Sequence, residues 1–409
     1  MDKTVYNSEC TIDGGNKMNN IISELNGDKK KIFNIIQKNG PITKNGVITL
    51  SNIKLTTLNR IIASLEEIGL INECGIGDST GGRKPSLYDV NLKRCYILGI
   101  DISRTYTQVI LANLKMEIVA KERFFMDDTY SPEKTVSAIR DIVNNIYVIL
   151  NINKKDILGA GLGTVGPLSI EKGLMINPTG FKAHAWNEVP IVDVLERALE
   201  LPTVIENGAN TAAVGEFYYG SHNVKSLAYI NFGIGIRAGY VTAGHIIRTR
   251  GNKEDVFGHM IIDIDGRLCK CGRYGCIEGY SSIEAIEGKF KAEAKKGKTT
   301  GINKDMNKIN FIDICKAAEK GDKLAFEIIS DAAYYMGAGL TNYISLLGPE
   351  VVILSGPLIN YSNVFYETSI EAVSRKNKGK NLTKFIKGGF YKESAIALGA
   401  AAMFLELCL

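Results

Sequence analysis

One histidine and three cysteines are spaced as metal ligands near the middle of the chain. Nine residues separate His259 from Cys269, one separates Cys269 from Cys271, and four separate Cys271 from Cys276. Three thiolates and one imidazole complete the tetrahedral shell of a structural Zn²⁺ and leave no position for a reactive water. The alternative, a cluster of reduced thiols without metal, would be prone to oxidation. We therefore predict a structural zinc site that holds the loop 259–276 in place.

A second group of side chains has the chemistry to read DNA bases. Arg and Asn can each bond two positions of a guanine or adenine edge, and Thr can contact the methyl group of thymine. In a helix-turn-helix, the early residues of the second helix of the pair face those edges. The residues expected there are Lys54, Thr56, Thr57, Asn59 and Arg60.

The glycine-rich stretch TGGRKP offers a second DNA contact. Gly81 and Gly82 permit close approach of the backbone, Arg83 and Lys84 are cationic, and Pro85 disfavours a helix. Such a segment can lie in a narrow minor groove, whose negative potential attracts arginine. For any single Lys or Arg, the alternative is a surface wing whose charge is only solvated. The helix and this stretch together favour DNA binding.

Three helices and a hairpin are needed to position these groups, and the pattern predicts them in residues 28–92. Apolar residues recur at helical spacing from Lys29, and Gly40-Pro41 ends that helix. Thr43 can cap a second helix through Leu50. A third helix is expected from about Leu55 to Ile68, with its apolar face packed inside. The hairpin strands are expected at Leu70–Cys74 and Ser86–Val90. This is the order of a winged helix-turn-helix.

Strand-like and helical segments alternate in the rest of the chain, residues 93–409, which indicates an α/β fold. Three strands followed by a helix occur near residue 96 and again near residue 226, and this pattern suggests two related halves. Residues 1–27 are polar and are expected to form a loose tail. The expected helices of this part are 132–150, 208–220, 281–297, 308–320, 322–346 and 393–407.

Composition limits the classes of protein that remain. The 409 residues carry a net charge of only +5, so any basic surface must be local. No apolar run reaches the roughly 18 residues of a membrane span, and the N-terminus has no apolar signal core, so we expect a cytoplasmic protein without membrane contact. The five cysteines outside the cluster are expected to be core or incidental thiols.

At these motifs the chain resembles the ROK family (repressors, open reading frames and sugar kinases), and in particular its repressor branch, similar to xylose and N-acetylglucosamine repressors. The resemblance covers about residues 28–409. It implies a two-lobed, actin-like (ribonuclease H-like) sugar-kinase fold behind the winged helix-turn-helix. The motifs that carry it are GGRKP, GIDIS, TVGP at 164–167, ENGAN at 206–210, GHM…CKCGRYGCIE at 258–278 and ILSGPL at 353–358.

The resemblance also implies where a sugar would bind. The family's sugar ligands that survive here are Asn207, His259 and Glu278. Val256 replaces a glutamate of the family pattern, although Glu254 and Asp255 lie close by in the sequence. Losing a polar partner in such a site costs about 1–3 kcal/mol. The effector is therefore a sugar or a sugar phosphate that binds in spite of this loss, or the site is vestigial.

Kinase chemistry is expected to be absent. The family's catalytic Asp, which takes the proton from the attacking sugar hydroxyl, is replaced by Gly208. The first phosphate loop reads DISRT at 101–105, with Arg104 where the kinases have glycine, and the second carries Ile234 and Arg237 in place of Thr and Gly. These departures together remove the base and both phosphate contacts.

The sequence thus predicts a transcriptional regulator that represses carbohydrate genes, including those for xylose, and that carries a catalytically inactive kinase-like domain. It would bind palindromic double-stranded operator DNA as a homodimer, with a tetramer as the alternative. Two other functions stay open at this point: an ATP-dependent sugar kinase with an appended DNA-binding module, and a ligand-independent DNA-binding protein.

Overall fold

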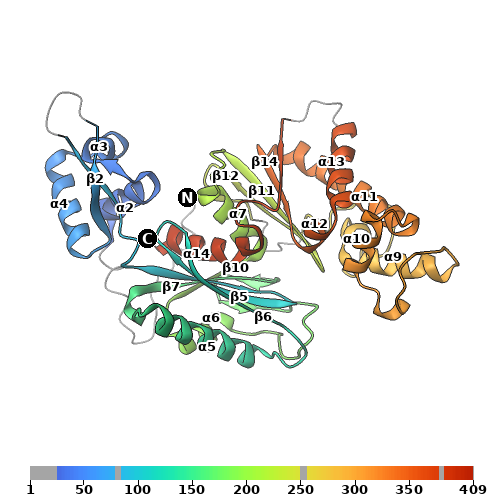
Figure 1. The fold of residues 1–409 in the computed structure, drawn as a ribbon. Helices are drawn as coiled ribbons and strands as arrows, with labels where there is room; N and C mark the ends of the chain where they lie inside the picture. Colours follow the sequence, from blue (N-terminus) through green and yellow to red (C-terminus); the bar gives the residue numbers. More distant parts are fainter. Residues whose placement is uncertain (1–24, 79–83, 249–255, 377–381, 409) are drawn as a thin grey trace. The chain divides into compact units, whose positions relative to one another are not determined.

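The computed structural model describes residues 25–78, 84–248, 256–376 and 382–408. The chain divides into two compact units (Figure 1). The first unit contains the residues up to Val165, Ser169–Gly208 and the residues from Ala397; the second contains Gly166–Leu168 and Ala209–Ile396. Among the described residues, no helix combines the length and the apolar character that a membrane span requires.

The first unit begins with the predicted winged helix-turn-helix. Its helices are α2 (Gly27–Asn39), α3 (Lys44–Ser51) and α4 (Leu55–Glu67). Its antiparallel sheet has the order β1-β3-β2, with β1 at Ile42–Thr43, β3 at Ser86–Val90 and β2 at Ile71–Ile76. The Thr43 hydroxyl caps α3 as expected, because it accepts a hydrogen bond of 3.1 Å from the amide of Gly46. The expected hairpin is present, whereas β1 was not predicted because a strand of two residues carries no periodic signal. The expected tail falls outside the described residues except for its last three.

The second part of this unit is a mixed sheet with the strand order β10-β7-β4-β5-β6. Helices α5 and α6 lie on one face and α14 on the other (Figure 1). The bounds are β4 Tyr96–Ile102, β5 Tyr106–Asn113, β6 Ile118–Phe125, β7 Ile157–Thr164, β10 Thr203–Asn207, α5 Pro132–Leu150, α6 Ile191–Leu199 and α14 Ala395–Cys408. A small hairpin of β8 (Leu168–Ser169) and β9 (Leu174–Met175) and the 3₁₀ turn η1 (Lys154–Asp156) complete this region.

Glycines in β4 and β7 allow α14 to pack directly on the sheet. A Cβ atom at Gly99 would lie 2.0 Å from the backbone oxygen of Ala397, and one at Gly161 would lie 1.8 Å from that of Ala400. No side chain can occupy those distances, so these glycines are required by the approach of the helix and not by a turn. The C-terminal helix is therefore part of the core of the first unit.

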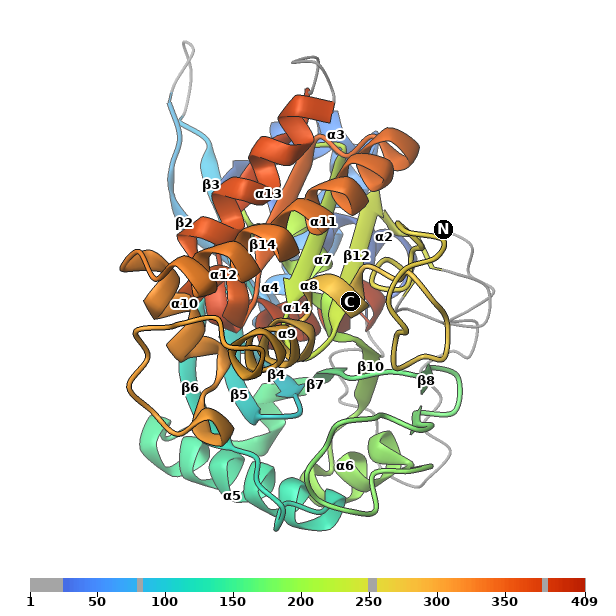
Figure 2. The ribbon, with the colours of Figure 1, turned by 90° about the vertical axis from the view of Figure 1, so that its right-hand side faces the viewer.

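The second unit contains a sheet with the order β13-β12-β11-β14-β15. Helices α11 and α13 cover one face of it (Figure 2), and their apolar side chains share one core with those of β11 and β14. The strands are β11 Ser226–Phe232, β12 Ile236–Thr242, β13 His245–Ile246, β14 Val351–Ser355 and β15 Lys384–Lys387. The helices are α7 Gly208–Tyr219, α8 Glu278–Ser281, α9 Ile283–Lys295, α10 Phe311–Glu319, α11 Lys323–Leu347, α12 Pro357–Tyr361 and α13 Asn363–Lys376, with 3₁₀ turns at η2 Met306–Lys308 and η3 Lys392–Ser394.

Both large sheets have the same topology. If the strands of each are renumbered along the chain, both read 3-2-1-4-5, with antiparallel pairing among the first three and parallel pairing of the fourth and fifth. This confirms the two related halves and the α/β class. Helices α6 and α13 and strand β15 were not predicted, although the apolar residues of α6 recur at helical spacing; β15 has only four residues.

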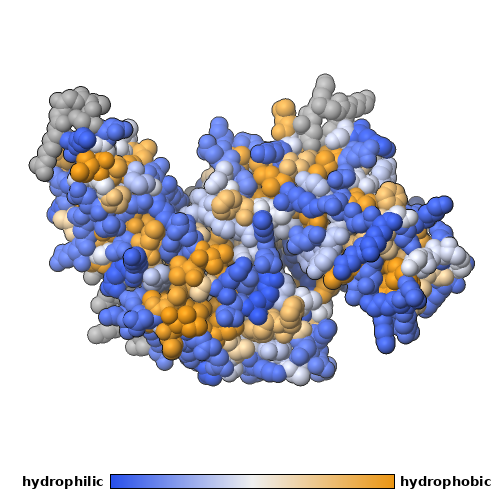
Figure 3. Space-filling view, viewed as in Figure 1, coloured by the Kyte–Doolittle hydropathy of each residue, from blue (hydrophilic) through white to orange (hydrophobic). Residues whose placement is uncertain are grey.

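The surface is mostly polar. Hydrophilic side chains dominate the face seen in Figure 3, and hydrophobic ones gather in separate patches. Large apolar side chains that are strongly exposed within the described residues include Phe125, Val148 and Ile149. Most of the apolar content instead fills the cores under the two sheets and between α2, α3 and α4.

Candidate DNA-reading helix and metal centre

Helix α4 separates its apolar and polar residues onto two faces. Leu58, Ile61, Ile62 and Leu65 are buried in the winged helix-turn-helix core. Of the residues predicted to read DNA, Lys54, Thr56, Asn59 and Arg60 are exposed and Thr57 is half-buried. The turn before α4 contains Asn52 in the left-handed conformation (φ 58°), which ends α3 and lets the chain turn into α4. Thr56, Asn59 and Arg60 therefore lie on the accessible face of α4, with Thr57 half-buried beside them and Lys54 just before the helix.

The part of the wing that the structure describes contains one basic side chain. Lys84 is exposed just before β3. The other predicted contact, Arg83, lies outside the described residues. Sequence reasoning missed Lys44, which begins α3 and bonds to Asn59 on α4. The sequence around Lys44 gave no indication of this contact, because Asn59 is fifteen positions further along the chain.

The four predicted metal ligands come together. Their ligand atoms all lie within 4.8 Å of one another. The Sγ of Cys269 is 3.7 Å from Nδ1 of His259, and the Sγ of Cys271 is 3.8 Å from that of Cys276. Ligand atoms at the corners of a tetrahedron with bonds of 2.0–2.3 Å stand about 3.3 to 3.8 Å apart. The cluster therefore fits a tetrahedral Cys₃His ion site.

Glycines shape the loop that carries these ligands. Gly272 (φ 85°) makes the tight turn after Cys271, and its amide donates to the backbone oxygen of Cys269 at 2.9 Å. Gly275 (φ 73°) precedes Cys276, and a Cβ there would lie 1.6 Å from the backbone oxygen of Asp263. Only glycine fits that position, so the CGRYGC spacing is imposed by the path of the backbone as well as by the ligands.

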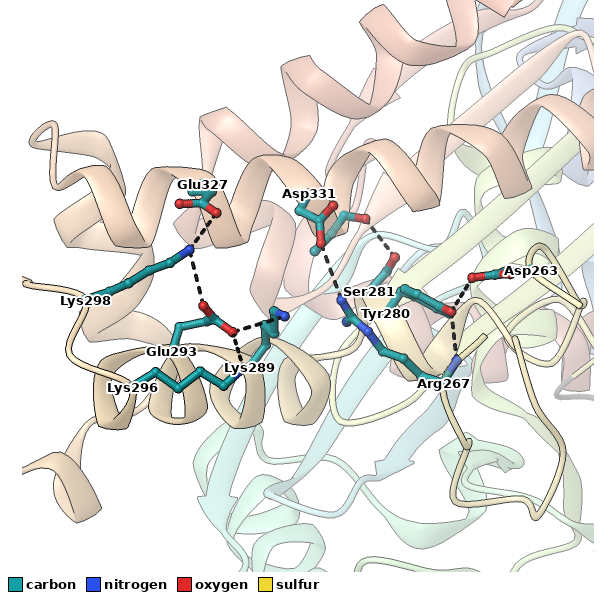
Figure 4. Close-up of polar contacts among 11 residues, drawn as sticks. Asp263, Arg267, Tyr280, Ser281, Lys289, Glu293, Lys296, Lys298, Glu327 and Asp331 are labelled. Carbon is teal, nitrogen blue, oxygen red and sulfur yellow. Dashed lines mark hydrogen bonds and ion pairs between the residues drawn. The ribbon is translucent and has the colours of Figure 1, made fainter. Parts of the chain in front are cut away.

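A tyrosine ties the same loop to α11 (Figure 4). The Tyr280 hydroxyl donates to the Asp263 carboxylate at 2.8 Å and accepts from the amide of Arg267 at 2.8 Å. The Arg267 guanidinium lies 4.5 Å from the centre of the Tyr280 ring and 3.5 Å from the carboxylate of Asp331 on α11. Next to it, the Ser281 hydroxyl donates to a backbone oxygen of α11 at 2.7 Å. Asp263 and Arg267 lie between His259 and Cys269, so these contacts fasten the same part of the loop that the expected metal ligands flank.

The lysine-rich end of α9 is internally neutralised. Glu293 pairs with Lys289, Lys296 and Lys298 at 3.0–3.3 Å (Figure 4). Hydrogen bonds from these ammonium groups lower the pKa of the Glu293 carboxyl to about 2. Lys298 also pairs with Glu327 on α11 at 2.9 Å. These lysines therefore stabilise a helix junction through ion pairs with Glu293 and Glu327.

The residues expected to bind sugar are buried or half-buried in their own units. Asn207 ends β10 in the first unit and is 1% exposed. His259 and Glu278 belong to the second unit, where the Glu278 amide donates to the oxygen of Gly258 at 2.8 Å. One Glu278 oxygen accepts from the amide of Ile236 at 2.9 Å. That carboxylate is thus already fixed by the backbone of the strand that carries Arg237.

The structure places the positions that are expected to differ from the family's kinases. Gly208 begins α7, and Val256 is 51% exposed. Arg104 is only 6% exposed, and its Nε donates to the backbone oxygen of Thr179 at 2.6 Å. Arg237 is 9% exposed in β12. Both arginines are therefore packed into their units. Glu254 and Asp255 lie outside the described residues.

Asp101 is a buried carboxyl in the first hairpin of the sheet. It is 2% exposed, and its Oδ2 has no hydrogen-bond partner among the described residues. Burial raises the pKa of Asp101 to about 7, against the opposing effects of a hydrogen bond from Tyr106 and the charge of Arg123. A carboxyl in this state is poorly suited to hold a metal-bound phosphate.

A winged helix-turn-helix joined to a duplicated α/β fold with a Cys₃His loop defines a DNA-binding protein built on a sugar-kinase-like scaffold. The chain belongs to the ROK family, whose sequence profile matches residues 97–406. A winged helix-turn-helix DNA-binding profile matches residues 29–72. The domain boundaries at 27/28 and 92/93 stay predictions.

Relatives and solved structures agree with this assignment. The chain is 28% identical over 392 residues to a xylose repressor of Caldicellulosiruptor bescii, covering 94% of this chain and 96% of that protein. It is 24% identical over 351 residues to the DNA-binding transcriptional dual regulator NagC of Escherichia coli, covering 84% and 83%. The crystal structure of a ROK family transcriptional regulator, a homologue of E. coli MLC, superposes with a TM-score of 0.77 at 21% identity, covering 93% and 96%. That likeness confirms the fold.

Proposed function

We propose that this protein is a DNA-binding transcriptional repressor of carbohydrate-metabolism genes, with xylose use as the first candidate. The observation that carries the proposal is the pairing, in one chain, of a winged helix-turn-helix whose α4 exposes a polar face with a ROK domain. A relative matched over more than nine tenths of both chains is named a xylose repressor. Such a protein would act in the cytoplasm, where the chromosome is.

In this proposal α4 enters the major groove and its exposed face contacts base edges. Arg60 is suited to a guanine edge and Thr56 to a thymine methyl group, while Lys54 and the wing residues Arg83 and Lys84 contact phosphates or the minor groove. Two-fold symmetric operators require two such helices, so the active form is a homodimer or a tetramer.

The kinase-like domain would have no phosphoryl-transfer activity. Gly208 supplies no base for the sugar hydroxyl. The buried guanidinium of Arg104 and the presence of Arg237 in β12 are inconsistent with glycine-lined phosphate loops. The domain would instead bind an effector and join subunits. The expected ligands of a sugar or sugar-phosphate effector are Asn207, His259 and Glu278.

The Cys₃His cluster would hold a structural Zn²⁺. His259, Cys269, Cys271 and Cys276 fill every tetrahedral position, so the ion would supply rigidity and no reactive water. The ion would hold together the two sides of a loop whose intervening residues Asp263 and Arg267 are bonded to Tyr280 and to Asp331 on α11. An effector at His259 could then act on the loop only through different affinities for two arrangements of the protein.

The direct test is a fluorescence-anisotropy titration with duplex fragments from upstream of its own gene, in the presence and absence of a sugar panel that includes xylose. The expected result is tight binding to one fragment, weakened by one sugar, with Arg60→Ala lowering affinity by about 5- to 150-fold. Binding no better than to random DNA at physiological salt would end the proposal.

The same protein discriminates the two other functions. Coupled ADP release over a hexose panel, abolished by Asn207→Ala, would identify a sugar kinase with an appended DNA-binding module. Specific DNA binding with no thermal shift from any sugar or sugar phosphate would instead indicate a ligand-independent DNA-binding protein.

A further inference from the structure

We propose that Lys44 sets the base preference of Asn59, so that this pair reads guanine and not adenine; the inference rests on the proposed DNA-binding function. Lys44 is the first residue of α3, and Asn59 lies one turn into α4. The Lys44 ammonium lies 2.8 Å from Oδ1 of Asn59. This contact joins the two helices of the helix-turn-helix at the face that would meet DNA.

The orientation of the Asn59 amide follows from the chemistry of this contact. An ammonium group has three donors and no acceptor, so it can bond only to the oxygen of the amide. The amide nitrogen, with its two donors, must therefore point away from Lys44. An asparagine side chain otherwise flips freely between its two orientations at an exposed site.

Lys44 is held where it can do this. Its side chain is half-buried, and its ammonium lies 5.3 Å from the centre of the Tyr88 ring. That distance is within the range of a cation–π contact. Tyr88 is itself 6% exposed in β3, where it pairs with Ile42 in the three-stranded sheet. The contact with the Tyr88 ring therefore restricts the conformations of the Lys44 side chain.

The resulting pair offers a base edge the N–H donors of the amide and of the ammonium, together with one remaining lone pair of Oδ1. Guanine offers two acceptors in the major groove, N7 and O6, whereas adenine offers the N7 acceptor and the N6 amino donor. A bidentate contact to adenine needs Oδ1 of Asn59 to accept from N6. The second lone pair of Oδ1 accepts from N6 only if that amino group lies beside the Lys44 ammonium, which is positively charged and has no acceptor. Guanine, whose N7 and O6 both accept from these donors, is therefore favoured, and removal of Lys44 removes this bias.

The test is selection of binding sites from a pool of randomised duplex DNA by the full-length protein and by its variants. Asn59→Ala identifies the base pair that Asn59 reads, because this variant should lose its sequence preference at that base pair and at no other. We expect guanine there with the unsubstituted protein. In Lys44→Met the ratio of affinities for guanine over adenine at that position should fall about tenfold, measured by anisotropy on two duplexes that differ only there.

Controls separate a base-reading role from a simple loss of charge. Lys84→Met removes one cation from the wing and should weaken all sequences alike, with a smaller salt dependence and an unchanged preference. Lys44→Arg keeps a donor-only partner for Asn59 and should retain guanine. Melting temperatures of the variants report whether they fold, and Lys44→Leu, which also lacks a donor and a charge, replaces Lys44→Met if that variant does not fold.

The outcomes are distinct. Adenine at the Asn59 position of the unsubstituted protein, an unchanged preference in Lys44→Met, or no altered position in Asn59→Ala would each overturn the inference. If the unsubstituted protein enriches no sequence from the pool, the proposed DNA-binding function fails first. Enrichment of a defined site by the unsubstituted protein supports that function independently of Lys44.

Discussion

The ammonium of Lys115 lies 2.9 Å from the carboxylate of Asp89, and this ion pair joins the first large sheet to the winged helix-turn-helix. Lys115 stands in the turn between β5 and β6, and it also donates to the backbone oxygens of Gln37 and Gly40 at 2.9 and 3.0 Å. The Gln37 side chain donates in return to the oxygen of Leu114 at 2.7 Å. The last carbonyls of a helix lack donors and attract cations, so Lys115 satisfies the end of α2.

Lys115→Met is expected to loosen this junction. The substitution removes the ammonium donor from Asp89 and from the carbonyls of Gln37 and Gly40, at a cost of about 1–3 kcal/mol. The melting temperature should fall, and amide hydrogen exchange should rise at residues 36–42. The matched control is Lys93→Met, which removes an exposed lysine before β4. Equal melting temperatures and equal exchange in both variants would show that the junction does not depend on Lys115.

Removal of the metal ion is expected to lower stability and to loosen the ligand loop. Elemental analysis should find about one zinc per chain, because the Cys₃His set forms a single tetrahedron. Chelation or Cys276→Ser should lower the melting temperature and raise hydrogen exchange at 259–276. Cys74→Ser, at an exposed cysteine outside the cluster, is the control and should retain zinc. A metal-free protein with full stability would contradict the prediction.

Asp101→Asn is expected to change the pH dependence of stability. The pKa of Asp101 is raised from 3.8 to about 7 by burial, so between these values the folded protein binds more protons than the unfolded chain. Stability is therefore lost as pH rises from about 4 to 7, by up to about 4 kcal/mol at roughly 1.4 kcal/mol per pKa unit. The asparagine variant lacks this loss and should melt higher above pH 7.

The measurement is the difference in melting temperature between Asp101→Asn and the unsubstituted protein from pH 4 to pH 8. That difference should grow with pH and level off above about 7. The exposed Asp128→Asn variant serves as the control and should show no such trend. A constant difference across the range would mean that Asp101 ionises as an ordinary carboxyl.

Restoring the missing base alone is not expected to restore a kinase. Gly208→Asp places a carboxylate at the start of α7, but Arg104 and Arg237 remain at the positions where the sequence comparison leads us to expect the phosphate-binding glycines of the kinases. ADP release over a hexose panel should stay at background in both proteins. Sugar-dependent turnover by Gly208→Asp would show that the altered phosphate loops still bind ATP, and turnover by the unsubstituted chain would refute the loss of catalysis.

Much of the fold followed from patterns within short windows. The apolar period of 55–68 located α4 to within one residue at its C-terminal end, and Ser86–Val90 was predicted with its observed bounds. The repeated order of strands near residues 96 and 226 indicated the two halves. Helix α13 and strand β15 escaped prediction because their apolar residues are few and irregularly spaced, so packing against α11 and β14 decides them.

The metal ligands and the polar face of α4 were determined by the sequence itself, because ligand spacing and helical period act over a few residues. The tertiary structure alone decided which distant groups meet them. Lys44 reaches Asn59, Lys115 reaches Asp89, and Gly161 admits the backbone of α14 only after the chain has folded. Each of these contacts joins segments that are far apart in the sequence. A pattern within a short window cannot indicate such a contact, because only tertiary packing brings the two segments together.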